Sequence, residues 1–351
     1  MTSGAPHAVG APPALRQDGG MASRVPLSIL DLAIVERGAT PRDALSASVV
    51  VAQRAEARGY RRVWYAEHHN MAAIASSATS VLIAHVAAHT SAIRLGAGGI
   101  MLPNHSPLVI AEQFGTLASL HPDRIDLGVG RAPGSDQVTA QALRRDIYAA
   151  DRFPDDVLEL QGYLTGRSLV EGVDAVPGKG TDVPLYVLGS SLYGAQLAAM
   201  LGLPYAFASH FAPQALEQAV ATYRREFRPS AQLAAPYVLA GVNVVAADTD
   251  DLAQEHLTAV RRARVARFVE RGAELTDEQA DAILASPQGR HLETMMRYTA
   301  VGTPHLVTRY LDEFATHAGT DELIVVHAGP TIDARLRSLD LLADASGLVP
   351  A

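Results

Sequence analysis

Two kinds of segment alternate along the chain from about residue 25 onward. Short apolar runs rich in β-branched residues are followed by longer, alanine-rich stretches with the spacing of amphipathic helices. The first pattern is typical of buried strands and the second of helices that cover them. About eight such rounds follow one another, which predicts parallel strands joined by crossover helices. We therefore expect an α/β fold of the (β/α)₈ TIM-barrel type.

The expected elements can be placed by residue. Strands are predicted at residues 26–33, 61–67, 92–100, 124–130, 183–190, 204–209, 237–247 and 322–328. Helical patterns cover residues 41–58, 76–89, 107–120, 191–202, 213–227, 303–319 and 334–344, with others on both sides of Asp151. An excess of about fifty residues, which includes residues 270–302, lies between the seventh strand and the last helical pair. Long connections at the catalytic face are often lids, so we expect part of this insertion to move over the ligand, with a static helical insertion as the alternative.

A doubly wound sheet with a dinucleotide site is the competing fold. The segment GVGRAPG, which starts at Gly128, has the spacing G-x-G-x-x-x-G and is one residue longer than the dinucleotide fingerprint. No acidic residue stands in an obvious place about twenty positions later. We therefore favour a single barrel domain over residues 25–345, preceded by a flexible tail of residues 1–24 in which Met21 offers a second start.

Composition narrows the classes of function. The chain of 351 residues has no cysteine, which excludes disulfides and thiolate chemistry and fits a cytoplasmic protein. Its formal net charge of -8 argues against nucleic acid as a partner, because a phosphate backbone needs a clustered positive field. No run of about 18 apolar residues marks a membrane segment. The one lysine, Lys179, lies in a Gly-rich turn outside the strands, which argues against Schiff-base chemistry.

Polar and small residues gather where the expected strands end, and a barrel carries its chemistry there. The second strand ends in EHHN, residues 67–70, which supplies a glutamate and two histidines. The candidates at the ends of the strands are Glu67, His68, His69, Gly98, Gly99, Arg131, Gly189, Ser190, Ser191, Ser209, His210 and His327.

Three of these features indicate an anionic ligand with a large flat body. Residues 189–191 open a helix directly after a strand, and a helix N-terminus offers unpaired N–H groups to a phosphate. Arg131, at the end of the neighbouring strand, can add a guanidinium to the same phosphate. Gly98 and Gly99 remove side chains from the barrel mouth, so a planar ring can approach the backbone closely.

Four segments carry a resemblance to a known family. The segments WYAEHHN, GAGGIMLPNHSPLVIAEQFGTL, LHPDRIDLGVGRAPGSD and LYVLGSSLYGAQLAAMLGLPYAFASHF resemble those of the bacterial luciferase-like flavin-dependent monooxygenases, in the branch without light emission. The resemblance extends over nearly the whole chain from about residue 26. It implies a barrel that binds reduced FMN at its C-terminal mouth and oxidises a small organic metabolite with O₂. It also implies a separate flavin reductase as partner and a homodimer formed through outer helices.

Site residues follow from this resemblance by position. The family's histidine that acts on the flavin intermediate corresponds to His68, and its non-prolyl cis peptide to the bond between Gly98 and Gly99. The phosphate arginine corresponds to Arg131, and the phosphate-binding turn to residues 189–191.

Three positions depart from luciferase itself. Its acidic residue in the phosphate-binding turn is replaced by Ser190, a hydroxyl residue of that turn by Gly194, and its reactive cysteine by Gly130. The changes at 190 and 130 argue against light emission. They leave the backbone N–H groups that hold the flavin phosphate in place.

The histidines have alternative roles. His68 and His69 are consecutive and point to opposite sides of an extended segment, so we expect only one to be catalytic, and both can be structural. His85 and His89 have helical i,i+4 spacing but lack the adjacent glutamate of a metalloprotease helix, so we predict no metal site.

The other candidates also have simpler explanations. Arg131 can pair with Asp126 or Asp136, the serines after the fifth strand can serve as a helix N-cap, and the two glycines can form a bulge. The arginine-rich segment at residues 261–267 is predicted to be a solvated helix face.

Three other functions stay open beside the monooxygenase. A relative of the same fold can use the deazaflavin F420 for hydride transfer without O₂. A flavin-binding protein without catalysis would share the site. A flavin-free barrel enzyme such as a phosphosugar isomerase would use the phosphate site alone.

Overall fold

Eight parallel strands form a closed ring in the computed structural model, which describes residues 25–132, 136–145, 148–269 and 275–350. The ring runs in the order β1, β2, β3, β4, β5, β6, β7, β9, and β9 pairs with β1 to complete it. The strands are β1 (Leu27–Asp31), β2 (Arg62–Tyr65), β3 (Arg94–Met101), β4 (Ile125–Gly130), β5 (Leu185–Gly189), β6 (Tyr205–Phe207), β7 (Val238–Ala246) and β9 (Glu322–His327). This confirms the predicted (β/α)₈ barrel. The tail predicted at residues 1–24 lies outside the described residues.

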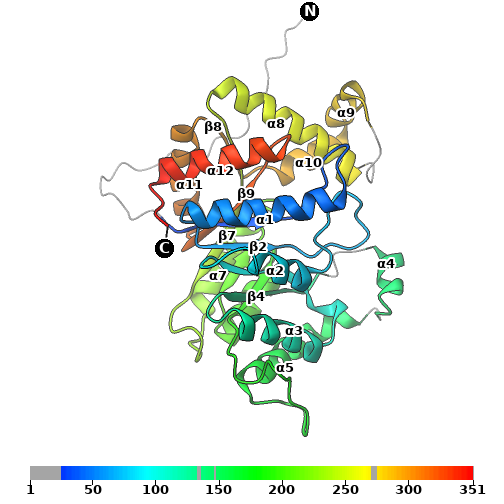
Figure 1. Cartoon of the computed structure of the whole chain (residues 1–351), viewed down its shortest axis with the longest axis vertical. Coiled ribbons are helices and arrows are strands. Elements are labelled where there is room, and N and C mark those ends of the chain that lie inside the picture. The colour runs from blue at the N-terminus through cyan, green and yellow to red at the C-terminus, as the bar shows by residue number, and fades with distance from the viewer. Residues whose placement is uncertain (1–24, 133–135, 146–147, 270–274, 351) are drawn as a thin grey trace, which may run out of the picture.

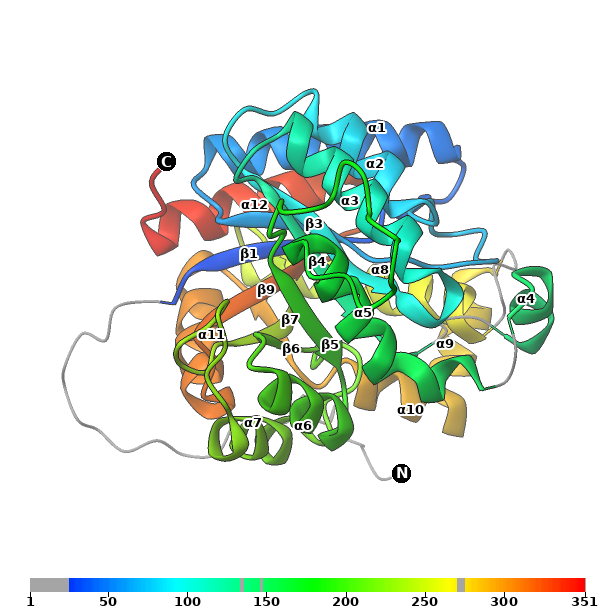
Figure 2. The ribbon, with the colours of Figure 1, turned by 90° about the horizontal axis from the view of Figure 1, so that it is seen from below.

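Helices surround the strands, which lie at the centre of Figure 2. The main ones are α1 (Pro41–Ala57), α2 (Thr79–Ala87), α3 (Pro107–Leu120), α5 (Phe153–Thr165), α6 (Leu192–Leu201), α7 (Leu216–Glu226), α11 (Pro304–Ala318) and α12 (Ile332–Ser346). The short helix α4 (Gln137–Ala142) stands apart at the side of the molecule (Figure 1). Each crossover helix therefore covers the outer face of the ring, as an all-parallel sheet requires.

The insertion between β7 and the last helices contains more than the predicted helical structure. It comprises α8 (Asp250–Arg264), a π-helical turn η3 (Val265–Val269), α9 (Asp277–Leu284), α10 (Pro287–Met295) and a short strand β8 (Thr299–Gly302). Strand β8 pairs with the last residues of β7, beyond most of the segment that pairs with β9, and lies outside the ring. Strand β8 was not predicted, because the sequence pattern of residues 270–302 was interpreted as an insertion rather than as a strand.

Local sequence signals fix the ends of α1. Thr40 caps the helix: its backbone N–H donates to the Asp43 carboxylate over 2.8 Å, and its hydroxyl accepts from the Asp43 N–H. Pro41 occupies the first turn, where no N–H partner is needed. Gly59 follows the helix with a φ of +80°, and a Cβ there would overlap the backbone of Val349. The predicted boundaries of this helix are therefore nearly those observed.

Side chains alternate between the inside of the ring and the helices outside it. The inside carries an apolar cluster: Leu30, Trp64, Ala66, Tyr186, Ala206, Leu239, Ile324 and Val326. Glycines of β3 make room for Trp64, since a Cβ on Gly96 would lie 2.9 Å from its Nε1 and a Cβ on Gly98 2.9 Å from its Cβ. The interior is thus filled by side chains, with the largest one accommodated by two glycines.

Buried charges occupy the other end of the ring, where the strands begin. Arg62, 2% exposed in its side chain, lies between Asp126 at 2.7 Å and Glu322 at 2.9 Å, both fully buried. Arg94 also reaches Asp126, at 2.5 Å. The hydroxyl of Tyr186 accepts from Arg62 over 2.7 Å. Every one of these charges is paired, so this end of the barrel holds a neutralised polar layer beneath the apolar cluster.

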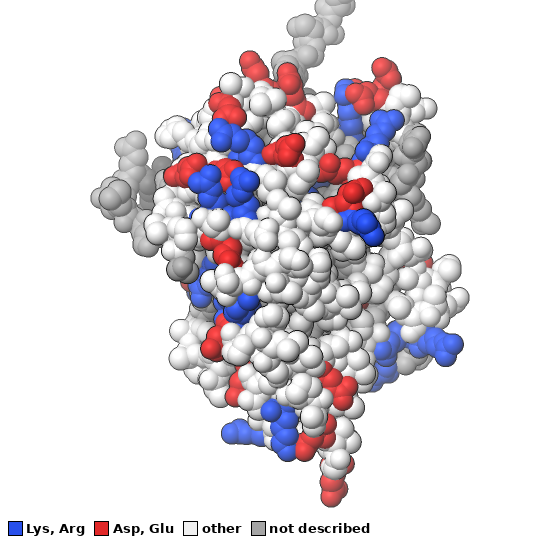
Figure 3. Space-filling view, in the orientation of Figure 1, with Lys and Arg blue, Asp and Glu red and all other residues white. Residues whose placement is uncertain are grey.

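The surface shows no strong separation of charge on the face in Figure 3, where acidic and basic side chains are intermixed. A broad area without charged residues occupies the middle of that face. None of the described helices has both the length and the apolar character needed to cross a lipid bilayer.

The buried layer generates a prediction about stability. Arg62→Met should lower the free energy of unfolding by about 3–5 kcal/mol, because two buried carboxylates lose their counter-charge. Arg61→Met is the matched control, since Arg61 is 45% exposed in its side chain and lies 3.7 Å from Glu322; it should cost less than about 1 kcal/mol. Urea unfolding measures both, and equal losses would contradict the assignment.

Candidate active site

A cavity of about 1190 Å³ opens at the carboxyl ends of the strands. All seven predicted site residues line it: His68, Gly98, Gly99, Arg131, Gly189, Ser190 and Ser191. Residues of α8, η3 and α9 line it as well. The insertion therefore covers the cavity, as expected of a lid, while its movement stays a prediction. Residues 270–274 of that segment lie outside the described part of the chain.

The turn between β5 and α6 presents a helix N-terminus without a side-chain cap to the cavity. Ser191 stands at the N-cap position in extended conformation, but its hydroxyl makes no capping hydrogen bond. Its carbonyl oxygen accepts a hydrogen bond from the hydroxyl of Tyr205 over 3.0 Å, and this bond anchors the turn to β6. The first N–H groups of a helix have no partner within it. The N–H groups of this turn are therefore suited to a phosphate. Ser191 occupies the N-cap position, but its hydroxyl does not cap the helix.

Arg131 lies over the first turn of α6. Its guanidinium carbon is 4.4 Å from the ring centroid of Tyr193, a cation–π contact that helps to orient the guanidinium. The alternative pairing with Asp126 is wrong, because the Asp126 carboxylate is engaged by Arg62 and Arg94 at the opposite end of the ring. The structure thus places a guanidinium and a helix N-terminus on the same part of the cavity.

The peptide bond between Gly98 and Gly99 is cis, as the resemblance implied. A Cβ on Gly98 would lie 3.0 Å from the Leu30 side chain, and one on Gly99 would lie 2.7 Å from the carbonyl oxygen of Gly128. Both positions are therefore too close to their neighbours for any larger residue without rearrangement. The result is a stretch of bare backbone on the cavity wall.

His68 is the histidine of the pair that faces the cavity. Nδ1 of its ring is buried and makes no hydrogen bond to the described residues. Burial lowers the pKa of His68, so the imidazole is neutral near pH 7 and can accept a proton. His69 turns the other way and binds Glu67, which confirms the prediction that the two side chains cannot share one site.

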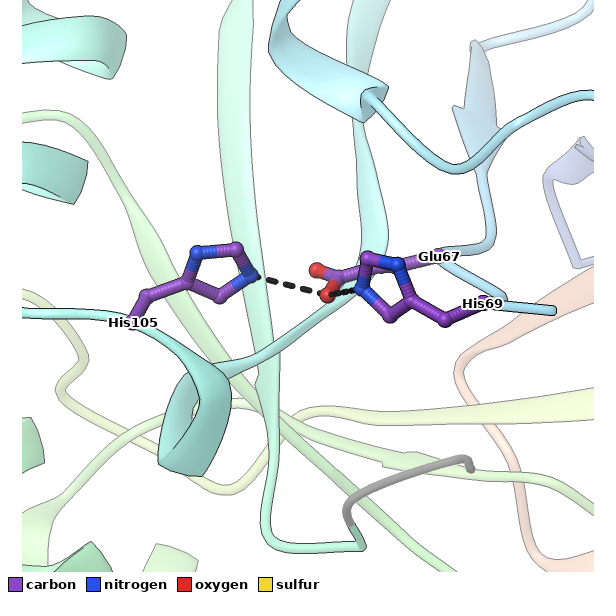
Figure 4. Close-up of side chains that lie close together, drawn as sticks. All are labelled: Glu67, His69 and His105. Atoms are coloured by element: carbon purple, nitrogen blue, oxygen red, sulfur yellow. Dashed lines mark hydrogen bonds and ion pairs between the residues drawn. The ribbon is translucent and has the colours of Figure 1, made fainter. Parts of the chain in front are cut away.

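Glu67 ties two loops together beside the cavity (Figure 4). One of its carboxylate oxygens accepts from Nε2 of His69 over 2.7 Å and from Nε2 of His105 over 2.8 Å. The other accepts from the backbone N–H of Met101 over 3.0 Å. Burial raises the pKa of Glu67, but the hydrogen bonds from His105, His69 and Met101 outweigh it and hold this pKa below its usual value.

The same three side chains have the types and spacing of metal ligands, with ligand atoms within 4.8 Å of one another. Both imidazoles, however, direct Nε2 at one carboxylate oxygen, and each bond has ordinary hydrogen-bond length. The arrangement supports a structural role: it joins the end of β2 to the segment after β3. The sequence could not show it, because the partner at position 105 lies 38 residues away.

Two further histidines line the cavity with different roles. Both ring nitrogens of His327 are engaged, with the Tyr60 hydroxyl at 3.2 Å and the Ser338 hydroxyl at 3.0 Å, so His327 is structural. His210 has a buried Nδ1 without a hydrogen bond to the described residues. Burial, helped by the nearby positive charge of Arg264, lowers the pKa of His210 to about 3. A second neutral imidazole therefore joins His68 at the cavity.

The prediction of a solvated face for residues 261–267 is wrong in part. Arg262 is 29% exposed in its side chain and pairs with Asp277 and Asp281 at 2.5 and 2.6 Å. Arg262, Arg264 and Arg267 all line the cavity. Helical periodicity identifies a polar face but not its surroundings, and here part of that face meets a polar cavity.

Comparison with known proteins identifies the family of this chain. The family model for luciferase-like monooxygenases matches residues 27–322. The chain belongs to this family. A luciferase-like monooxygenase of Escherichia coli (strain K12) is 46% identical over 325 residues, which are 91% of this chain and 96% of that protein. N-acetyl-S-alkylcysteine monooxygenase of Bacillus subtilis (strain 168) is 33% identical over 339 residues, which cover 91% and 97%.

Solved structures of luciferase-like proteins share the barrel. Apo-MsnO8 has a TM-score of 0.84 and 36% identity, over 94% of this chain and 99% of that one. More distant barrels include the oxygenating constituent of 3,6-diketocamphane monooxygenase from Pseudomonas putida in complex with FMN, with a TM-score of 0.66 and 17% identity. An F420-dependent secondary alcohol dehydrogenase has a TM-score of 0.67 and 18% identity. At such identities the likeness shows the fold alone.

The Glu67 cluster predicts a pH-dependent contribution to stability. Because the folded pKa of Glu67 lies below its unfolded value of about 4.3, the contribution is present above that pH and is lost as the pH falls through the folded pKa. Glu67→Gln should cost about 1–3 kcal/mol at pH 7, and the difference from wild type should shrink below about pH 4. Glu171→Gln, at an exposed position, serves as control. A pH-independent difference in urea unfolding would refute the assignment.

Proposed function

We propose that this luciferase-like protein is a monooxygenase that uses reduced FMN and O₂ to oxidise a small organic metabolite, with a separate flavin reductase supplying the reduced FMN. One observation carries the proposal: Arg131, the first turn of α6 and the neutral His68 all open onto one cavity. A phosphate site and an acid–base group on the same cavity match a phosphorylated redox cofactor whose reaction needs proton transfer.

The residues present fit FMN. The N–H groups at the start of α6, the hydroxyls of Ser190 and Ser191, and the guanidinium of Arg131 would hold its phosphate. The bare backbone at Gly98 and Gly99 would accept the flat ring system. No side chain has to move out of the way at these two glycines, so the cradle is already shaped for a planar ligand.

When bound, reduced FMN supplies the two electrons that let O₂ transfer one oxygen atom to the substrate and release the other as water. The protein contributes positioning, exclusion of water and proton transfer. Apolar side chains of Leu30, Trp64, Ile100 and Ile324 line the cavity, which keeps water from the reacting atoms. His68, neutral near pH 7, can accept a proton at its ring nitrogen and return it.

Two other functions share some of these features. An F420-dependent oxidoreductase would use a phosphate site of this kind for hydride transfer without O₂, and a non-catalytic flavin-binding protein would need no acid–base group. The buried, unbonded Nδ1 of His68 favours catalysis, because leaving a polar atom without a partner costs stability that a mere carrier has no reason to lose. The choice between FMN and F420 requires measurement.

Anaerobic spectral titration tests the cofactor. The protein should bind reduced FMN about a hundredfold more tightly than reduced F420, and oxygen uptake should follow when O₂ and substrate are added. Preference for F420, or turnover without oxygen consumption, would reject the monooxygenase in favour of the hydride-transfer enzyme. Flavin binding without oxidation of any substrate tested would favour the carrier.

The phosphate site can be tested separately with FMN and riboflavin, which differ by the phosphate. Arg131→Ala should weaken FMN binding by about 10-fold to 100-fold and leave riboflavin binding nearly unchanged, since one charge-assisted contact is lost. Arg309→Ala, at an exposed position of α11, is the control. Equal effects on the two ligands would place the phosphate elsewhere.

Replacement of His68 tests the acid–base role. His68→Ala should preserve FMN binding and slow turnover by about a hundredfold or more, the usual scale for a positioned acid or base. His85→Ala, on the outer helix α2, should leave both unchanged. Unchanged turnover in His68→Ala would remove this residue from the mechanism.

A further inference from the structure

The cavity carries more positive than negative side chains. Six arginines line it (Arg37, Arg131, Arg262, Arg264, Arg267 and Arg335) against three carboxylates (Glu36, Glu67 and Asp277). Asp277 is engaged by Arg262, and Glu67 by two histidines. Arg335 binds Asp31 behind the cavity wall, at 2.8 Å. The excess of positive charge therefore comes from few residues. One of them is Arg264.

Arg264 ends α8 where the π-helical turn begins, and this partly buried arginine lines the cavity. Its one hydrogen bond within the described chain goes from Nη2 to the side-chain oxygen of Asn243, over 2.8 Å. Asn243 is fully buried and donates in turn to the carbonyl oxygen of His210 over 2.7 Å. The guanidinium is thus held in a fixed position by a neutral amide.

No carboxylate pairs with Arg264 among the described residues, although a charge partly withdrawn from water is ordinarily paired with a counter-charge. Burial lowers the pKa of Arg264 to about 10, and the charge of Arg267 lowers it further in the same direction. The side chain remains cationic at neutral pH. The arrangement has the character of an anion site in which the protein supplies the cation and the ligand supplies the anion.

Arg264 is separate from the predicted phosphate site. Arg131 follows β4 and the helix N-terminus follows β5, whereas Asn243 belongs to β7 and His210 follows β6. The two cationic positions therefore belong to different parts of the rim. The apolar side chains of Leu239 and Phe211 line the same cavity.

From this geometry we propose that Arg264 binds the carboxylate of the organic substrate, so that the enzyme acts on small organic acids with an apolar body. The inference rests on the proposed function, in which this cavity also holds the cofactor. The carboxylate would pair with the free N–H groups of Arg264, and the apolar body would extend towards His68 and the flat ring site. Arg264 is then a specificity residue that decides which end of the substrate faces inward.

Paired ligands that differ only in charge test this proposal. Hexanoate and hexanamide are titrated into the FMN-loaded protein, with binding followed by calorimetry. Wild type should bind hexanoate about tenfold more tightly, and Arg264→Met should abolish the preference. Arg264→Lys, which keeps the charge, should retain part of it. Arg337→Met, which removes an exposed arginine paired with Asp248 outside the cavity, should behave as wild type.

Three results would overturn the proposal. Equal binding of hexanoate and hexanamide by wild type would do so even if Arg264→Met failed to fold. Retention of the preference in Arg264→Met would exclude this residue. A selective loss of FMN over riboflavin in Arg264→Met would show that the anion is the cofactor phosphate. Failure of wild type to bind FMN would instead reject the proposed function, so the two hypotheses fail by different measurements.

Discussion

Closure of the parallel ring between β6 and β7 is the constraint on which the site depends. Because all eight strands run in one direction, their carboxyl ends meet at a single rim. Residues as far apart in sequence as His68, Arg131 and Arg264 are therefore neighbours around one cavity. Without the short pairing of residues 205–207 with residues 238–240, the rim would open between β6 and β7.

The two ends of the barrel differ in how their arginines are paired. Where the strands begin, Arg62 and Arg94 are matched by Asp126 and Glu322, so the charges are satisfied within the protein. Where the strands end, the side chain of Arg264 makes one hydrogen bond within the described residues, to the amide oxygen of Asn243. The first arrangement stabilises the fold, and the second is the basis of the proposed carboxylate site. This asymmetry explains how a chain of net negative charge can present a cationic cavity.

Neighbouring histidines at the rim have different surroundings. His68 lines the cavity with an unbonded nitrogen, while His69 and His105 hold the carboxylate of Glu67. That carboxylate also fixes the backbone at Met101, just beyond the two glycines of β3. The candidate acid–base residue His68 and the carboxylate of Glu67 thus come from one short segment. Membership of the luciferase-like family does not select the cofactor, since distant barrels of this fold carry FMN or F420.

The alternation of apolar and amphipathic segments determined the barrel, the order of its strands and the rim positions of the predicted residues. It could do so because parallel strands and their crossover helices leave local periods that a single sequence displays. The bounds of α3, residues 107–120, were predicted to the residue, since Pro107 marks its start. Even the division between His68 and His69 followed from the local geometry of an extended chain.

Only the tertiary structure decided what surrounds each polar side chain. Arg262, Arg264 and Arg267 lie on one helical pattern, and only the packing of α8 over the rim shows that they line a cavity and that Arg262 also pairs with Asp277. The bond between His105 and Glu67 and the stacking of Arg131 on Tyr193 also join residues that are far apart in the sequence. The pairing of β8 with β7 was likewise found only in the structure. A sequence records which residues are polar; whether they meet water, a partner or a cavity depends on contacts that form only when the ring has closed.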